Sequence, residues 1–460
     1  MHAEAAYLFR HALLRDAAYQ LQMPAERERL HRLIVDILED IGGARPPLPD
    51  LLLEHIEAHP MDAFAAEVVE HVRRCDPRNL PADILRVYLS RAAVLAERNF
   101  QNSAAIEVLE ELANNDGDDA WRSQCTLRAA EIADRAGLIP VAQALANQGL
   151  ELAARSGRKD LERRALRLCA WVCQHLDELD KAEQHFSRLR ELRSGNKATL
   201  EALSELCTEA AFARAIGDLP RCELLAVSAL ECAAVVNTPK ALAMAHGVMG
   251  NLKTDQRKYA EAEQHILWAI EIKKPMGRTF SLAISLGNLG NAIGFLGRLK
   301  ESDKAYQESL EIFREVGAQM SEAIAISRLG TNRLQLGDLA GAEQLLNHAI
   351  ARLTDLGNIR FAAVAMGNLA HVFHSSSRDV EALETAQRAL DVHRKCRNRI
   401  FEANTLLLLS DVTYAHGQVL LSCEYMTDAV NVYRELQMLD TAESHEHDRL
   451  RRLATTIDVA

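Results

Sequence analysis

Residues 283–317 read AISLGNLGNAIGFLGRLKESDKAYQESLEIFREVG, two apolar segments of helical length that each end in a glycine, Gly297 and Gly317. Glycine adopts the left-handed conformation that ends a helix without steric cost. The apolar spacing predicts one helix over residues 280–296 and a second over residues 300–315. Because the link between them is short, the two helices are expected to run antiparallel.

The same glycine signal recurs along the chain at intervals of 20 residues. Nine of the sixteen points of this lattice between residues 137 and 437 are glycine, although the 460-residue chain has only 22 glycines. These nine are Gly137, Gly157, Gly217, Gly277, Gly297, Gly317, Gly337, Gly357 and Gly417. A regular alternation of helix and stop predicts one array of helix pairs with a 40-residue period rather than several globular domains.

Small residues recur in register with this period. A Gly, Ala or Ser stands seven positions before the end of the first helix in every unit, and Gly250, Gly290 and Gly330 fill that position in three consecutive units. A glycine inside a helix costs about 1 kcal/mol relative to alanine. These three therefore need a packing reason, and we predict that two helix backbones approach closely there.

The spacing of the small residues resembles the tetratricopeptide repeat in its longer bacterial form, over about residues 120 to 440. A HEAT-type repeat has a similar period, but the small positions in register and the lack of a signal for a kinked first helix favour the tetratricopeptide interpretation. The resemblance implies an all-α fold, a right-handed α-solenoid of antiparallel helix pairs whose first helices line a concave surface. It also implies a function in protein–protein interaction.

Three parts of the chain are expected on this basis. Residues 1–75 form an N-terminal helical segment, and residues 76–440 form the solenoid, with eight clear units and one doubtful unit near residues 92–112. Residues 441–460 form a C-terminal capping helix and tail, because polar and charged side chains dominate there.

A second resemblance lies near the N-terminus. Residues 9–13 read Phe-Arg-His-Ala-Leu and resemble the end of the winged-helix segment of bacterial signal-transduction (STAND-type) ATPases, which leads into tetratricopeptide repeats. This implies a regulatory arm whose catalytic part lies upstream or on a partner chain. The alternative is a plain N-terminal cap. The sequence contains no glycine-rich phosphate loop closed by Lys and Ser or Thr.

Composition excludes several classes of partner. The net charge is −12, so the chain as a whole lacks the basic surface that nucleic acid or an anionic membrane requires. No stretch approaches 18 uninterrupted apolar residues. The nine cysteines are odd in number and lack framework spacing, which favours reduced thiols and a cytoplasmic location.

No catalytic or metal site emerges from residue spacing. No set of nucleophile, base and orienting group can be assembled, so we expect no enzymatic activity, no cofactor and no metal. His371 and His374 share a helical face, but polar lining of the groove is the favoured interpretation over metal binding. Cys169 and Cys173 are expected to be buried thiols.

The candidate site is the concave surface of the first helices. Polar side chains occupy its outward positions in successive units, namely Asn251, Asn291, Thr331, His371 and Asp411, with Arg214, Thr254, His374 and Tyr414 one turn further on. Asparagine offers both a donor and an acceptor, so Asn251 and Asn291 are suited to bind the backbone of an extended peptide. The alternative is that these side chains merely face solvent.

The sequence thus predicts a non-enzymatic module that binds a protein or peptide segment, as a sensor or scaffold in bacterial signalling. No repeated Lys and Arg pair specifically favours an acidic C-terminal peptide. A small molecule in the groove and the oligomeric state are left open.

Overall fold

The computed structural model describes residues 19–457, except 54, 55, 82, 116, 177, 194–197 and 437. Throughout these residues the regular secondary structure is helical, without a strand. The predicted all-α solenoid of helix pairs is confirmed. Contacts divide the chain into two compact units, Met1–Ala133 with Pro140–Ala165, and Asp134–Ile139 with Leu166–Ala460. The Phe-Arg-His-Ala-Leu segment lies outside the described residues.

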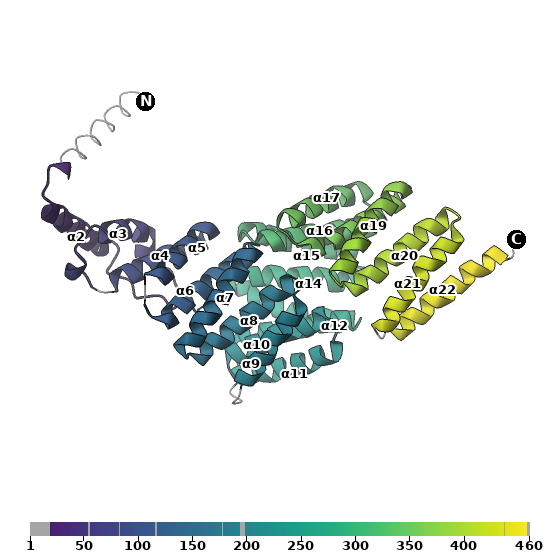
Figure 1. Ribbon diagram of the computed structural model, residues 1–460, viewed down its shortest axis with the longest axis horizontal. Coiled ribbons are helices and arrows are strands. Elements are labelled where there is room, and N and C mark those ends of the chain that lie inside the picture. Colours follow the sequence, from purple (N-terminus) through teal and green to yellow (C-terminus); the bar gives the residue numbers. More distant parts are fainter. Residues whose placement is uncertain are drawn as a thin grey trace, which may run out of the picture. The chain divides into compact units, whose positions relative to one another are not determined.

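The first unit contains α2 to α7 and two short 3₁₀ helices (Figure 1). Their bounds are α2 Pro24–Ile41, η1 Pro60–Phe64, α3 Ala65–Val72, η2 Pro77–Asn79, α4 Ile84–Arg98, α5 Asn102–Asn114, α6 Asp119–Arg135 and α7 Ile139–Ser156. Helices α4 and α5 pack together at the position of the doubtful unit. The chain between α2 and η1 is irregular, and the buried guanidinium of Arg91 donates to the carbonyl oxygens of Pro47 and Glu57, each at 3.0 Å.

The second unit contains the regular array. Its helices are α8 Lys159–His175, which begins in the first unit, α9 Leu179–Leu192, α10 Leu200–Ala215, α11 Leu219–Val236, α12 Pro239–Asp255, α13 Tyr259–Lys273, η3 Lys274–Met276, α14 Phe280–Phe295, α15 Leu299–Glu315, α16 Gln319–Gln335, α17 Leu339–Asp355, α18 Ile359–Ser375, α19 Asp379–Lys395, α20 Arg399–Ala415, α21 Val419–Glu435 and α22 Leu439–Ile457. Even-numbered helices from α10 to α20 are the first helices of their pairs. Odd-numbered helices from α11 to α21 are the second.

The 20-residue lattice is a property of the backbone and not only of the glycines. All nine lattice glycines have φ between 63° and 90°. The other described lattice points between 137 and 417 also have positive φ, from 49° to 58°, although they are occupied by Asn237, Arg257, Ser377 and Arg397. A single non-glycine residue tolerates this conformation at modest cost. Each helix therefore ends at the same register whichever residue stands there.

Close packing of helix pairs explains the glycines within the first helices. A Cβ atom on Gly250 would lie 2.5 Å from Ile266 of α13, and one on Gly290 would lie 2.8 Å from the ring of Tyr306 on α15. A Cβ on Gly330 would lie 2.9 Å from Leu346 of α17. The prediction that two helices approach closely at this position is confirmed.

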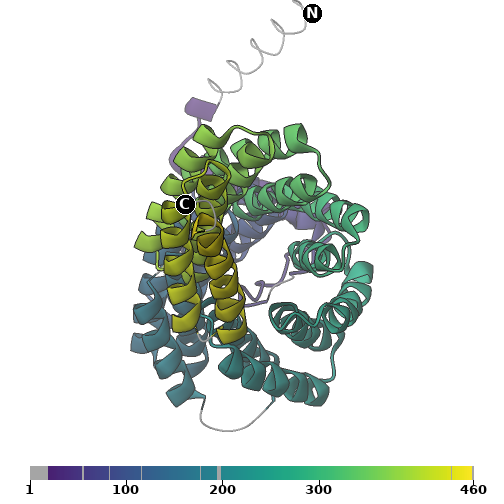
Figure 2. The same cartoon turned by 90° about the vertical axis from the view of Figure 1, so that its right-hand side faces the viewer.

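The first helices form the inner layer of the curved array. Direct contacts between alternate helices link α10 with α12, α12 with α14, α16 with α18, and α18 with α20. Among the described residues, no pair of second helices in this unit is joined as extensively. A layer whose members approach one another more closely lies on the inside of a curve, so the first helices line the concave face. Figure 2 shows the helices from α11 onward following this curved path.

The last described helix, α22, packs on α21. Within the described part of the chain, no helix is both long enough and apolar enough to cross a membrane.

Candidate binding groove

Distant first helices share one space on the concave face. The charge of Arg214 on α10 acts on the guanidinium of Arg328 on α16, which belongs to a repeat three units further along the chain. Burial in protein lowers the pKa of Arg328, and the positive charge of Arg214 lowers it further, opposed only by Tyr306. The concave face therefore surrounds Arg328 with protein from several repeats.

Two other ionisable groups on the inner helices respond in the same way. Desolvation lowers the pKa of His371 although the negative charge of Asp411 opposes it. Desolvation also raises the pKa of Asp255 although Arg214 lies 3.4 Å away. Both His371 and Asp255 are exposed to solvent. Both groups are therefore partly enclosed by neighbouring protein on the concave face.

A cavity of about 120 Å³ opens beside Arg328 between α14, α15 and α16. Its lining consists of Asn291, Gly294, Phe295, Ser302, Tyr306, Arg328, Thr331, Asn332 and Gln335. The buried Tyr306 donates its hydroxyl hydrogen to Oδ1 of Asn291. The structure thus places two predicted residues, Asn291 and Thr331, at one cavity, and it fixes the orientation of the Asn291 amide.

The other residues of the predicted polar row differ in how free their side chains are. Asn251 is half-buried on α12. Thr254 donates to the carbonyl oxygen of Gly250 at 2.9 Å, so its hydroxyl hydrogen is used within its own helix. Thr331 donates to Ser327 O at 3.0 Å and accepts from Asn368 Nδ2 at 2.9 Å. The last contact links the inner faces of α16 and α18.

The two predicted histidines do not form one site. His374 Nδ1 lies 2.7 Å from Asp379 on α19, and His416 Nε2 lies 2.9 Å from the same carboxylate. The His374 contact is the main reason that the pKa of Asp379 is lowered. His371 instead lies on the concave face. In the described ranges, no group of three or more His, Cys, Asp or Glu side chains is arranged to hold a metal ion.

Helix α22 contacts one end of the predicted row. Arg452 lies 2.6 Å from the carboxylate of Asp411, and its guanidinium stacks over the ring of Tyr414 at 4.6 Å from the centroid. It also donates to Ser410 Oγ at 3.1 Å. Two predicted groove residues therefore contact helix α22 of the same chain, and both remain exposed to solvent.

Arg328 was missed by sequence reasoning. It stands nine positions before Gly337, in a column that also holds Asn288 and Asn368, whereas the prediction used only the columns six and three positions before the helix end. Polar residues at this third column were the available signal.

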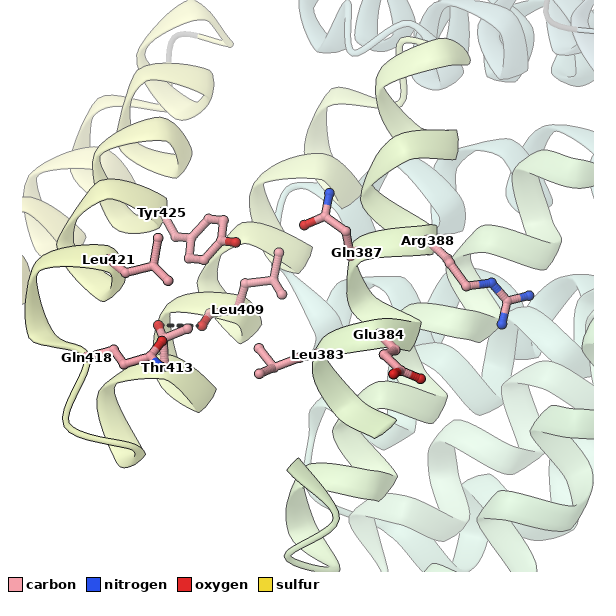
Figure 3. Close-up of a pocket in the computed structure, with 9 residues that line it drawn as sticks. All are labelled: Leu383, Glu384, Gln387, Arg388, Leu409, Thr413, Gln418, Leu421 and Tyr425. Atoms are coloured by element: carbon pink, nitrogen blue, oxygen red, sulfur yellow. Dashed lines mark hydrogen bonds between the residues drawn. The ribbon is translucent and has the colours of Figure 1, made fainter. Parts of the chain in front are cut away.

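A larger cavity, of about 530 Å³, lies elsewhere in the same unit (Figure 3). Its lining comes from α19, α20 and α21 and includes the apolar side chains of Leu383, Leu409, Leu421 and Tyr425. Thr413 points its hydroxyl to the carbonyl oxygen of Leu409 at 2.8 Å. Because two of the three helices are second helices, this cavity is separate from the concave trough.

The predicted buried thiols are confirmed. Cys169 and Cys173 are both buried, and desolvation raises their pKa to about 12 and about 11. Thiols in this state are unreactive at neutral pH.

Comparison with known proteins agrees with this architecture. Residues 281–355 match the family model of the tetratricopeptide repeat. No curated protein sequence matches the chain. Among solved structures, it is similar to a Rap protein complexed with competence and sporulation factor, with 12% identity, a TM-score of 0.51, and coverage of 73% of this chain and 99% of that chain. It is also similar to a STAND protein with a tetratricopeptide repeat sensor from Pyrococcus horikoshii, with 14% identity, a TM-score of 0.44, and coverage of 94% and 66%.

At these identities the structural likeness concerns the fold alone. Residues 281–355 carry tetratricopeptide repeats, and the fold resembles that of the Rap protein.

Proposed function

We propose that this chain is a non-enzymatic interaction module that binds an extended segment of a partner protein along its concave groove, as a sensor or scaffold in bacterial signalling. The observation that carries the proposal is a second column of small residues on the first helices. Ten positions before the helix end stand Gly247, Gly287, Ser327 and Gly367 in four consecutive units. We call these residues the open column.

Packing does not account for two members of the open column, Gly247 and Gly367, whereas at Gly287 a Cβ atom would lie 3.3 Å from Ser309 Oγ. A Cβ atom on Gly247 would have no neighbour within 4 Å, and one on Gly367 would meet only the hydroxyl of Thr405, at 3.7 Å. This contrasts with Gly250, where a Cβ would lie 2.5 Å from Ile266. A glycine within a helix lowers stability by about 1 kcal/mol relative to alanine, so Gly247 and Gly367 need another reason. Close approach of a ligand to the helix backbone supplies one.

The neighbouring side chains suit a peptide main chain. Gly247 and Asn251 are four residues apart, so they lie on one face of α12, and Gly287 and Asn291 repeat this arrangement on α14. An amide beside a bare stretch of helix can donate to and accept from an extended backbone that lies in the groove. The fold of the Rap protein, whose structure was solved with competence and sporulation factor bound, supports this use of a similar solenoid.

The proposal is tested by filling the open column. Leucine at both Gly247 and Gly367 should leave the chain folded and reduce partner capture at least tenfold. Partners are captured from the native host with the full chain, then compared quantitatively by mass spectrometry. Thr354→Leu, which adds an exposed leucine on the second helix α17, is the matched control and should retain the same partners. Equal capture by the filled and control variants would show that the groove is not the binding surface.

A further inference from the structure

We propose that Arg328 and the cavity beside it form a subsite for a carboxylate group, so that the segment bound in the groove carries an acidic side chain at one fixed position. This inference rests on the proposed function and specifies the ligand's chemistry. The sequence has no repeated Lys and Arg pair that would favour an acidic C-terminal peptide, and the subsite proposed here is for an acidic side chain instead.

Arg328 lacks the partner that neighbouring arginines have. Arg333 on the same helix lies 2.8 Å from Asp303, and Arg298 contacts two glutamates at 2.6 and 2.7 Å. No ion pair links Arg328 to a carboxylate of the described residues, and the charges that act on it come from Tyr306 and Arg214 alone. A desolvated cation without a counter-charge is unfavourable by itself and is stabilised when an anion binds.

The cavity lining matches the same chemistry. It contains one guanidinium, three amides, three hydroxyls and no carboxylate. Tyr306 occupies Oδ1 of Asn291, so the amide nitrogen of Asn291 remains available as a donor. Asn332 already donates to Leu299 O at 3.1 Å. Arg328, Asn291 and Gln335 are thus the donors left for a ligand, and a guanidinium is well suited to bidentate contact with a carboxylate.

The shape of the cavity depends on two missing side chains. A Cβ on Gly287 would lie 3.4 Å from Nη1 of Arg328, and Gly294 also lines the cavity. The volume of about 120 Å³ exceeds that of a single water several times, since one water needs roughly 10 to 15 Å³. Phe295, which is 60% exposed and stacks on Tyr259, gives the cavity one apolar edge.

Arg214 is expected to support the subsite at longer range. It is paired with Asp255 at 3.4 Å, but desolvation raises the pKa of that carboxyl group, so the pair is poorly hydrated as well. The positive charge of Arg214 adds to that of Arg328 in the same space. Both residues lie on inner helices of the second unit.

The test is selection of a random decapeptide library on the full chain. Selected peptides should share an acidic residue at one position, and its replacement by Gln or Asn should weaken binding at least tenfold. Arg328→Gln should cause the same loss, and the two changes together should cost little more than either alone, because they remove one interaction. Arg388→Gln, which removes an exposed arginine from the separate cavity, is the control and should leave affinity unchanged.

The outcomes separate the two proposals. If selected peptides bind in the groove with an affinity that changes neither when their acidic residues are replaced nor with Arg328→Gln, this result refutes the carboxylate subsite but not the proposed function. Two other results would also refute the proposal that the ligand is an acidic side chain. One is tighter binding of a phosphoserine peptide than of the same peptide with glutamate, and the other is loss of binding only when the peptide C-terminus is amidated. If no peptide is selected, or if selected peptides bind the variant with leucine at Gly247 and Gly367 equally well, the proposed function itself fails.

Discussion

Replacing glycine by alanine at two positions of neighbouring first helices should have opposite effects on stability. Gly290 faces the ring of Tyr306, and an added Cβ would lie 2.8 Å, 2.9 Å and 3.0 Å from three ring carbons. The ring cannot easily move aside, because it is buried and its hydroxyl is bonded to Asn291. Gly247 faces open space, with nothing within 4 Å of an added Cβ.

The magnitudes follow from two terms. Alanine gains about 1 kcal/mol over glycine inside a helix, and this gain applies at both positions. Overpacking against a fixed neighbour costs roughly 1 to 3 kcal/mol, and this cost applies only at Gly290. We therefore expect Gly247→Ala to raise the free energy of unfolding by about 1 kcal/mol, and Gly290→Ala to lower it by up to about 2 kcal/mol.

The assay is urea unfolding followed by circular dichroism, with the midpoint compared between the two variants and the unchanged chain. Midpoints are preferred because a long repeat array need not unfold in a single step. Equal stabilisation by both substitutions would refute the close approach of α14 and α15 and, with it, the packing reason for Gly250 and Gly330. Destabilisation by Gly247→Ala would show that the open column is not open.

Three further outcomes are expected. Asn251→Ala should leave the unfolding midpoint nearly unchanged. Asn291→Ala should lower the free energy of unfolding by about 1 to 3 kcal/mol, because the buried Tyr306 hydroxyl loses its acceptor. Equal midpoints of the two variants would contradict the hydrogen bond between Tyr306 and Asn291. Arg328→Met should raise the thermal midpoint, since it removes a desolvated, unpaired charge, and a lower midpoint would indicate that the guanidinium is satisfied within the chain. Burial lowers the pKa of His393 to about 4, so between pH 6.5 and 4 the unfolded chain binds a proton that the folded chain does not. The free energy of unfolding should therefore fall by up to about 3 kcal/mol as the pH drops across this range. In urea titrations His393→Leu should reduce that loss, and an unchanged pH dependence would contradict this prediction.

The sequence alone predicted the helix pairs and their period because these depend on local chemistry. The quoted segment contains the apolar spacing of two helices and the glycines that end them, and the structure places α14 at Phe280–Phe295 and α15 at Leu299–Glu315. Close packing at Gly250, Gly290 and Gly330 was also predictable, because a glycine within a helix is costly unless a neighbour requires it. The left-handed residues at Arg257 and Ser377 could not be read locally, because neither residue type favours that conformation.

The candidate site was only partly predictable, because its side chains contact residues that lie far away in the sequence. The polar row was found from spacing, but its members differ in function because partners from other helices decide which atoms remain free. Tyr306 occupies one end of the Asn291 amide, and Arg452 pairs with the exposed carboxylate of Asp411. Arg328 is an ordinary helical arginine in the sequence, and it becomes a desolvated cation because the array curves and brings Arg214 from three repeats away into the same space. Local spacing thus determined the helices and their register, while curvature, which accumulates over many repeats, determined which charges meet in the groove.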